Sequence, residues 1–338
     1  MQLIRCTDAQ SFGAITPGSV LCHDVRDPEQ TRSVVLRKGR RLDRDDLVRL
    51  RALNLPEVHI VIPEAGDLLE DEAAARIAAA VAGDGVRPTE SHFGQVNLVA
   101  ARRGWLRVKQ CGVERVNLTE GALLFTSIGE RAADEGETVG GVKCAPLVLP
   151  GAASAAIEAL ATEHGPVVEV VPFPERKVAL IGLDRLGATT LDRARAALGA
   201  SVAWHGSQLD PVLFVPATGS APADAYRRAF ADGASAILVA GASATDPLDA
   251  AFEGLRQAGG TVDQIGIPIE PGTACWIGQL GSVQVLGLAS CELFGRQGAV
   301  DLLLPRLLLG ERLDRALLAR LASIGLVESL PVHRALTD

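Results

Sequence analysis

The clearest pattern in the chain is an alternation of short apolar runs with amphipathic stretches after residue 177. The predicted order is strand Val178–Leu183, helix Thr189–Leu198, strand Val202–His205, helix Ala223–Ala231, strand Ala236–Ala240 and helix Leu248–Ala258. Such an alternation is typical of βαβ units with right-handed crossovers. We therefore predict an α/β fold, in which residues 175–310 form a three-layer domain with a mostly parallel sheet.

The pattern changes after Gly260. Residues Cys275–Gly287 read as strand, turn and strand, which predicts a hairpin that returns to the sheet. Two further helices are predicted over Ala299–Leu309 and Asp314–Ser323, and residues 311–338 are assigned to a C-terminal helical extension. The apolar stripe of these helices covers either the core or a dimer interface, and both alternatives stay open.

Residues 1–174 have no such alternation and are predicted to form a mixed α+β region. It divides into two candidate lobes, residues 1–65 and residues 86–150, joined by a helix over residues 68–82. That helix is rich in alanine, the best helix former, with apolar positions three and four residues apart. Three prolines around a valine-rich run predict a linker over Gly165–Pro174.

Composition narrows the class of protein. The formal net charge of −8 gives no basic surface for a phosphate backbone, so a nucleic-acid partner is not expected. The apolar runs are far shorter than the roughly 20 residues that span a bilayer, so no membrane segment is expected. The six cysteines lack metal-ligand spacing, and the first residues lack a signal-peptide pattern. We therefore expect reduced thiols, a cytoplasmic location and no protein-bound metal.

The first candidate site covers Gly182–Thr190. A strand end, a glycine-bounded turn and a helix start follow one another here, and Gly182, Thr189 and Thr190 are the candidate ligand contacts. Backbone amides and the dipole at a helix N-terminus attract anions. The alternative is an ordinary helix start after a turn, because the segment lacks the known nucleotide-binding spacings.

The second candidate site covers Gly241–Asp249. Small residues allow a ligand to approach the backbone, and the candidate contacts are Gly241, Ser243, Thr245, Asp246 and Asp249. The alternative is a helix start with Asp246 as N-cap, Pro247 in the first helical position and Asp249 in the first turn. Both interpretations stay open.

The third candidate site combines Pro268–Gly272 with Gly287–Cys291. Gly272 and Ser290 are the candidate ligand contacts, since they lie at predicted turns and strand ends. A nucleophilic role for Cys291 is not favoured, because no histidine is near it in the sequence.

The order of these segments resembles the molybdopterin-binding domain of molybdenum-cofactor biosynthesis proteins. The similarity covers most of residues 177–310 and is strongest to bacterial molybdopterin-binding proteins. In the N-terminal half, Leu36–Asp46, Glu70–Ala75, Gly94–Leu98 and Val142–Lys143 also resemble that family. No nucleotidyltransferase domain follows, so the resemblance does not imply that activity.

The resemblance implies a ligand and roles for residues. Gly241 and Ser243 would line a pterin-phosphate pocket, and Asp249 would match the catalytic aspartate of the family. The ligand would be molybdopterin, with magnesium and a nucleotide if the chemistry is retained as an adenylyltransferase or molybdotransferase-like activity. Ala242 and Ala289–Cys291 depart from the family pattern, which bears on catalysis more than on binding.

Three functions follow as alternatives. The first is a molybdopterin-binding protein in cofactor biosynthesis or delivery. The second is a non-catalytic carrier or regulatory partner of a molybdoenzyme. The third is an α/β enzyme that acts on another phosphorylated small molecule. The family also implies a homo-oligomer of unspecified number.

Overall fold

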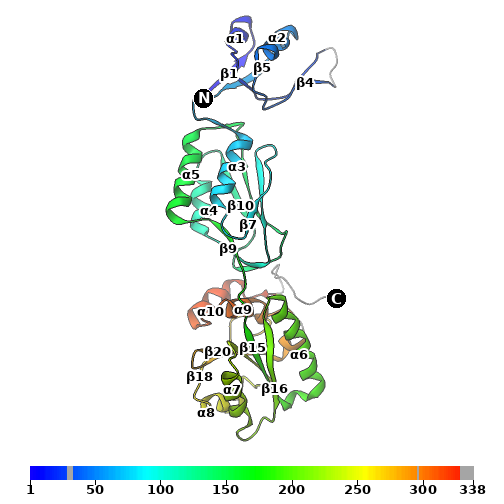
Figure 1. The fold of residues 1–338 in the computed structure, drawn as a ribbon, viewed down its shortest axis with the longest axis vertical. Coiled ribbons are helices and arrows are strands. Elements are labelled where there is room, and N and C mark those ends of the chain that lie inside the picture. Colours follow the sequence, from blue (N-terminus) through cyan, green and yellow to red (C-terminus); the bar gives the residue numbers. More distant parts are fainter. Residues whose placement is uncertain (29–32, 295–296, 328–338) are drawn as a thin grey trace. The chain divides into compact units, whose positions relative to one another are not determined.

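The computed structural model describes residues 1–28, 33–294 and 297–327. The chain divides into two compact units (Figure 1). The first unit comprises Met1–Arg102, Leu106–Glu130 and Asp134–Val171, and the second comprises Arg103–Trp105, Arg131–Ala133 and the chain from Pro172 onward.

The first unit contains short strands and five helices among its described residues. Their bounds are β1 Gln2–Cys6, α1 Ala9–Gly13, β2 Val20–Leu21, β3 Val25–Arg26, β4 Val34–Leu36, α2 Arg44–Ala52, β5 Val58–Ile62, β6 Leu68–Leu69, α3 Glu70–Val81, β7 Val86–Pro88, β8 Gln95–Ala100, β9 Gly104–Val108 (which begins in the second unit), α4 Gln110–Asn117, β10 Ala122–Thr126, β12 Thr138–Cys144, β13 Val148–Leu149, α5 Gly151–His164 and β14 Val168–Val171.

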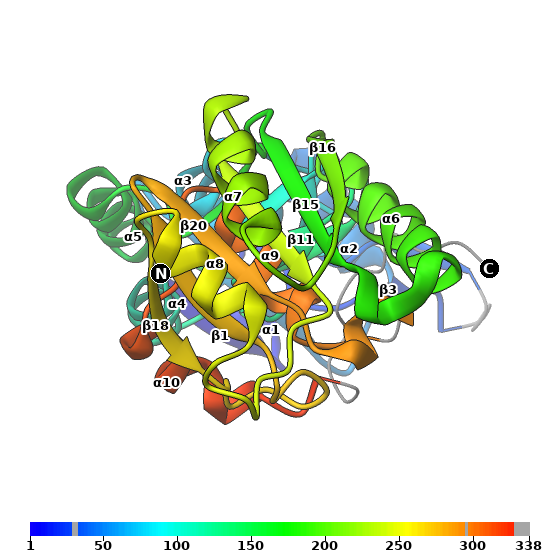
Figure 2. The same cartoon turned by 90° about the horizontal axis from the view of Figure 1, so that it is seen from below.

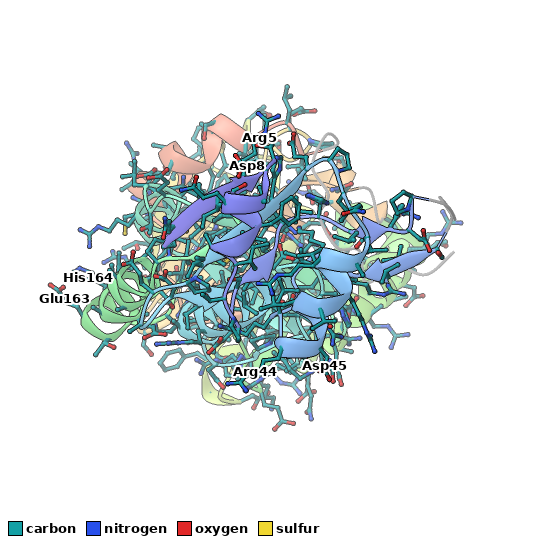
Figure 3. All side chains as sticks on the ribbon, turned by 90° about the horizontal axis from the view of Figure 1, so that it is seen from above. Arg5, Asp8, Arg44, Asp45, Glu163 and His164 are labelled. Atoms are coloured by element: carbon teal, nitrogen blue, oxygen red, sulfur yellow. The ribbon has the colours of Figure 1, made fainter. Side chains whose placement is uncertain are left out.

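The N-terminal part of this unit forms its own small core. Strands β1, β5 and β2 pair antiparallel, and α2 begins with a capping box in which Asp43 accepts a hydrogen bond from the Asp46 amide. Arg44 and Asp45, which open α2, are labelled in Figure 3 together with Asp8, the N-cap of α1. The caps fix where both helices begin, because they satisfy amides that the helix itself leaves without partners.

The middle part of this unit is built around α3. This helix buries Ala73, Ala74, Ile77, Ala78 and Val81 and packs against β8, β12 and α5. Strands β10, β12, β8 and β7 form the four-stranded antiparallel sheet beneath it. The predicted helix over residues 68–82 is therefore confirmed, shortened by two residues at its start and one at its end.

The second unit contains the α/β domain. Its elements are β11 Arg131–Ala133, β15 Lys177–Leu183, the 3-10 turn η1 Asp184–Leu186, α6 Gly187–Trp204, β16 Gln208–Val215, α7 Ala221–Ala231, β17 Ala236–Ala240, α8 Ala250–Gln257, β18 Thr261–Ile265, β19 Trp276–Leu280, β20 Val283–Gly287, η2 Ser290–Phe294, α9 Ala299–Leu308, α10 Arg315–Leu321 and η3 Ala322–Ile324.

The central sheet of this unit is mixed. Its strand order is β16-β15-β17-β20-β19-β18, in which β16, β15, β17 and β20 are mutually parallel (Figure 1). The hairpin of β19 and β20 is antiparallel, and β18 pairs antiparallel with β19. The α/β class and the predicted hairpin are confirmed, while the sheet is less parallel than predicted because this hairpin returns to it.

Helices lie on both faces of this sheet (Figure 2). Alternate residues of β15 point to opposite sides: Val178 and Leu180 pack with α6, α9 and α10, whereas Ala179 and Ile181 pack with α7 and α8. This alternation is what a strand covered on both faces requires. In the described part of the chain, no helix combines the length and apolar character needed to cross a membrane.

The predicted strand Val202–His205 is wrong. Val202–Trp204 are the last residues of α6, and His205 is its C-cap. Val202 is a buried helical position, and the strand follows at β16. Pro211 lies inside β16, which a central strand would not tolerate, but β16 is an edge strand of the sheet. Helix packing at Val202 outweighed its preference for a strand.

Two elements of the first unit also differ from expectation. The segment Gly165–Pro174, predicted as a linker, contains strand β14, whose residues Val168 and Val170 are buried. Helix α4 follows β9 without a predicted counterpart. Its sequence has few strong helix formers, so its apolar contacts decided its structure rather than its local propensity.

The close approach of Trp276 to β20 gives a stability prediction. A Cβ atom on Gly287 would lie 1.8 Å from Nε1 of the buried Trp276 indole, so Gly287→Ala forces the core to move. We expect a loss of about 1–3 kcal/mol in unfolding free energy, measured by urea denaturation.

The matched control is Gly199→Ala in the interior of α6, where the added methyl meets only Leu209 at 3.8 Å. This control is expected to stabilise by roughly 0.5–1 kcal/mol, because alanine restricts the unfolded chain. Equal effects of the two substitutions would contradict the packing described for Trp276.

Candidate binding site

The carboxyl ends of the parallel strands meet at one edge of the second unit's sheet, and the connections diverge between β15 and β17. From β15 the chain passes through α6 to β16, whereas from β17 it passes through α8 to β18, on the other side of the pair. In open α/β sheets, such a reversal leaves a crevice at the carboxyl ends of the two strands, where ligands bind. A ligand-binding site is therefore expected at this edge of the sheet.

Two glycines bring the backbone close at this point. Gly182 in β15 pairs with Ala240, the last residue of β17, and Gly241 follows with a φ of +93°. A Cβ atom on Gly182 would lie 2.6 Å from Leu191, and one on Gly241 would lie 3.1 Å from the Leu183 side chain. Gly241 is required both by its conformation and by this crowding.

Asp249 is the most highly connected residue of this edge. It is the N-cap of α8, and its Oδ1 accepts a hydrogen bond from the Ala251 amide at 2.8 Å. Its Oδ2 accepts from the Ser243 amide at 2.9 Å and forms an ion pair with Arg185. The Asp249 side chain is 0% exposed, so both oxygens are held by protein donors.

The alternative in which Asp246 caps the helix is wrong, because the N-cap is Asp249, three residues later. Asp246 instead forms a turn, in which its carbonyl accepts from the Asp249 amide and its Oδ1 from the Leu248 amide. Ser243 and Thr245 lie on the loop with their hydroxyl oxygens 3.1 Å apart. The loop therefore presents two adjacent hydroxyls above a buried carboxylate.

Arg185 was not identified from the sequence. It lies in η1, directly after β15, and its side chain is 42% exposed while its Nη1 contacts buried Asp249. The two residues are 64 positions apart in the chain, so no local spacing indicated the pair. A search for cations directly after predicted buried strands could have found it.

The start of α6 completes this part of the site. Thr189 is exposed and Thr190 half-buried, both within the first turn of the helix. No side chain caps this helix, whose first residue, Gly187, has a φ of +68°. The first amides of α6 thus lie at the same edge as the loop after β17.

The third candidate segment is divided between two places. Ser290 is exposed just beyond β20, which pairs with β17, so it lies at the same edge of the sheet. Gly272 is instead buried against the start of α9, where its φ is +120° and an added Cβ would lie 2.4 Å from Ala299 Cβ. The structure therefore brings Gly182, Gly241, Ser243 and Asp249 together, and gives Gly272 a separate environment.

That environment contains Glu292, a second residue that the sequence analysis missed. Its two carboxylate oxygens accept hydrogen bonds from the Ala299 and Val300 amides at 3.0 and 3.1 Å. Burial raises the pKa of Glu292 to about 7, although these amides partly oppose the shift, and Asp301 and Glu270 contribute negative charge. Gly272 and Gly298 have no side chains that would displace this carboxyl group.

The structure contains hollows away from this edge. One of about 540 Å³ lies in the first unit between α1 and α2, and one of about 360 Å³ lies by the starts of β18 and β20. The second is lined by Thr261, Asp263, Gln279, Ser282, Gln284, Gly310 and Arg312. Among the described residues, no group of three or more His, Cys, Asp or Glu is placed to hold a metal ion.

The pKa of Glu292 predicts a pH-dependent stability. The folded protein holds this proton more tightly than the unfolded chain, whose glutamate pKa is near 4.5. The stabilisation is complete below that value and is lost as pH rises through about 7. We expect unfolding free energy to fall by up to roughly 3 kcal/mol between pH 4.5 and 8 because of this residue.

Urea denaturation of the wild type and Glu292→Gln across this pH range measures the effect. The variant has no proton to lose, so the difference between the two proteins should change with pH in the stated direction. A constant difference would show that Glu292 has an ordinary pKa.

Comparison with known proteins gives similarities to solved structures only. No family model matches the sequence, and no curated protein matches it. A molybdopterin biosynthesis protein from Mycobacterium abscessus is 16% identical over 45% of this chain and 100% of that chain, with a TM-score of 0.29. A molybdenum cofactor biosynthesis protein from Pyrococcus furiosus is 12% identical over 91% of this chain and 63% of that chain, with a TM-score of 0.24.

A third solved structure, the molybdopterin biosynthesis MoeA protein from Pyrococcus horikoshii, is 14% identical over 72% of this chain and 79% of that chain, with a TM-score of 0.30. Solved structures similar to this chain are thus molybdenum-cofactor biosynthesis proteins. At these TM-scores and identities, the likeness carries no argument about the fold or the activity of this chain.

Proposed function

We propose that this chain binds molybdopterin in molybdenum-cofactor biosynthesis or delivery. The site is the carboxyl edge of the second unit's sheet, between β15 and β17. The observation that carries the proposal is the reversal of connections at this point, where Gly241, Ser243 and Asp249 come together. Crevices of this kind bind phosphorylated ligands through loop amides and hydroxyls.

The proposed contacts follow from the chemistry of the ligand. Molybdopterin has its own dithiolene sulfurs, so the protein need not supply thiolates, and its phosphate requires donors. The proposed phosphate contacts are the loop and helix-start residues Gly182, Thr189, Thr190, Gly241, Ser243 and Thr245. Asp246 and Ser290 are proposed to line the same site, and Gly272 to shape the loop beside it.

A second candidate function is binding without catalysis, as a carrier or regulatory partner of a molybdoenzyme. The observation that favours it is the burial of Asp249, whose two oxygens already accept bonds from Ala251, Ser243 and Arg185. A carboxylate whose oxygens are occupied in this way has few acceptor positions left to coordinate magnesium. Adenylyl transfer or molybdate insertion with magnesium and a nucleotide remains the catalytic alternative, with Asp249 as its predicted catalytic group.

The remaining proposals concern the setting of this site. A homo-oligomer and a cytoplasmic location are proposed together with the cofactor role. The alternative ligand is another phosphorylated small molecule, for which the same donors would serve equally well.

The ligand assignment is tested by titrating molybdopterin into the purified chain under anaerobic conditions. Isothermal titration should give one site per chain, and mass spectrometry of protein from a molybdenum-replete host should detect the pterin. Retention of a nucleotide or a sugar phosphate in place of the pterin would favour the alternative ligand. Failure of both measurements with fresh ligand would overturn the molybdopterin assignment.

Catalysis is tested separately with Asp249→Ala. If the chain is an enzyme, adenylylation or molybdate insertion in the presence of magnesium and nucleotide should be detectable in the wild type and fall by at least about 100-fold in this variant. If the chain is a carrier, the wild type should bind molybdopterin and show neither activity. Activity that survives the substitution would exclude Asp249 as the catalytic group.

A further inference from the structure

We propose that Arg185 is the residue that binds the phosphate group of the ligand, and that buried Asp249 holds its guanidinium in position. This inference rests on the proposed function, because it names the anion-binding residue of that same site. It assigns Asp249 a positioning role rather than a catalytic one.

Arg185 lies where the connections of β15 and β17 reverse. It follows β15 directly, and its partner Asp249 lies in the loop after β17, so their ion pair joins the two loops at the reversal. The Asp249 side chain is 0% exposed, whereas that of Arg185 is 42% exposed. The pair therefore has a buried, fixed end and a solvent-accessible cationic end.

Arg185 also supplies positive charge at the ends of the parallel strands. The four parallel strands β16, β15, β17 and β20 are followed by residues 216–220, 184–186, 241–249 and 288–289. Among these described residues, Arg185 is the one lysine or arginine. These loops also contain two carboxylates besides that of Asp249: Asp184 accepts a hydrogen bond from the Ala217 amide at 3.0 Å, and Asp246 accepts one from the Leu248 amide at 3.0 Å. A dianionic phosphate at this edge thus has one cationic side chain within these loops.

The planar guanidinium group of arginine is well suited to bind a phosphate group. Arginine has five N–H donors in a planar fork, and it binds phosphate through two parallel hydrogen bonds. The contact with Asp249 uses Nη1, so the fork is oriented by a carboxylate that is itself fixed by the Ser243 and Ala251 amides. An arginine restrained in this way loses less side-chain entropy when an anion binds.

The same contacts explain why Asp249 is buried with so many donors. The Asp249 carboxylate accepts hydrogen bonds from two backbone amides and from the Arg185 guanidinium, so protein donors occupy both of its oxygens. The Asp249 side chain is 0% exposed, whereas the Arg185 side chain reaches solvent. Asp249 therefore acts on the ligand through Arg185.

The test compares the affinity of the full chain for molybdopterin, its dephosphorylated form and inorganic phosphate, by isothermal titration at fixed ionic strength. Arg185→Gln should weaken binding of molybdopterin by roughly 10- to 100-fold and leave binding of the dephosphorylated form unchanged. Arg185→Lys, which keeps the charge without the fork, should lose less. The matched control is Arg195→Gln on α6, where another exposed arginine lies 4.0 Å from Asp192 and no effect is expected.

Asp249→Asn tests the positioning role. It should reduce affinity for molybdopterin but not for the dephosphorylated form, and it should have little further effect in the Arg185→Gln background. A purely structural Asp249 would weaken both ligands alike and would add its effect to that of Arg185→Gln. Thermal unfolding of each variant separates loss of fold from loss of affinity.

The outcomes distinguish the two proposals. If Arg185→Gln binds molybdopterin as tightly as Arg195→Gln does, the inference about Arg185 is overturned and the proposed function stands. If the wild type binds inorganic phosphate through Arg185 but not molybdopterin, the anion site stands and the pterin assignment is overturned. Binding of neither ligand by the wild type overturns both.

Discussion

The carboxylate of Asp249 connects three segments on which the geometry of the sheet edge depends. It begins α8, it holds the loop after β17 through the Ser243 amide, and it contacts Arg185 after β15. A buried charge is costly unless it is paired and hydrogen-bonded, and here both conditions are met. Removal of any one partner therefore affects the whole edge and not a single contact.

The layers around the sheet make this arrangement possible. Helices on both faces bury all of β17 and, apart from Lys177, all of β15, so that the polar groups of this region gather where the two strands end. Tyr226 joins α7 to α8 through a hydrogen bond to the Ala251 carbonyl, close to the cap formed by Asp249. Packing and hydrogen bonding therefore set the position of the α8 N-terminus, and with it the position of the loop.

The region where the β18–β19 loop meets η2 and the start of α9 has a different electrostatic character. Glu292 is buried against the start of α9, and Glu270 and Asp301 add negative charge near it. None of these three groups is a cation, whereas Arg185 places a cationic side chain beside the loop after β17. The two sides of the edge thus differ in the charge that they offer to a ligand.

The sequence by itself determined the α/β class, the helix α3 and most helices and strands after residue 177, because their apolar periodicity and glycine punctuation are local. It also named Gly182, Gly241, Ser243 and Asp249 as candidate ligand contacts, because they lie at the end of a predicted buried strand or in the loop that follows one. It predicted a strand at Val202, where burial in α6 favoured a helix instead. It also left open a helix start at Asp246, whereas the carboxylate of Asp249 caps the helix.

The roles of Arg185 and Glu292 were decided by the tertiary structure alone. Arg185 lies 64 residues from Asp249, and Glu292 owes its raised pKa to burial, with smaller contributions from the negative charges of Asp301 and Glu270. Local sequence carries no record of which strand ends become neighbours or of which carboxyl groups become buried. Strand order and packing supply that information, because they bring distant residues together and remove water from between them.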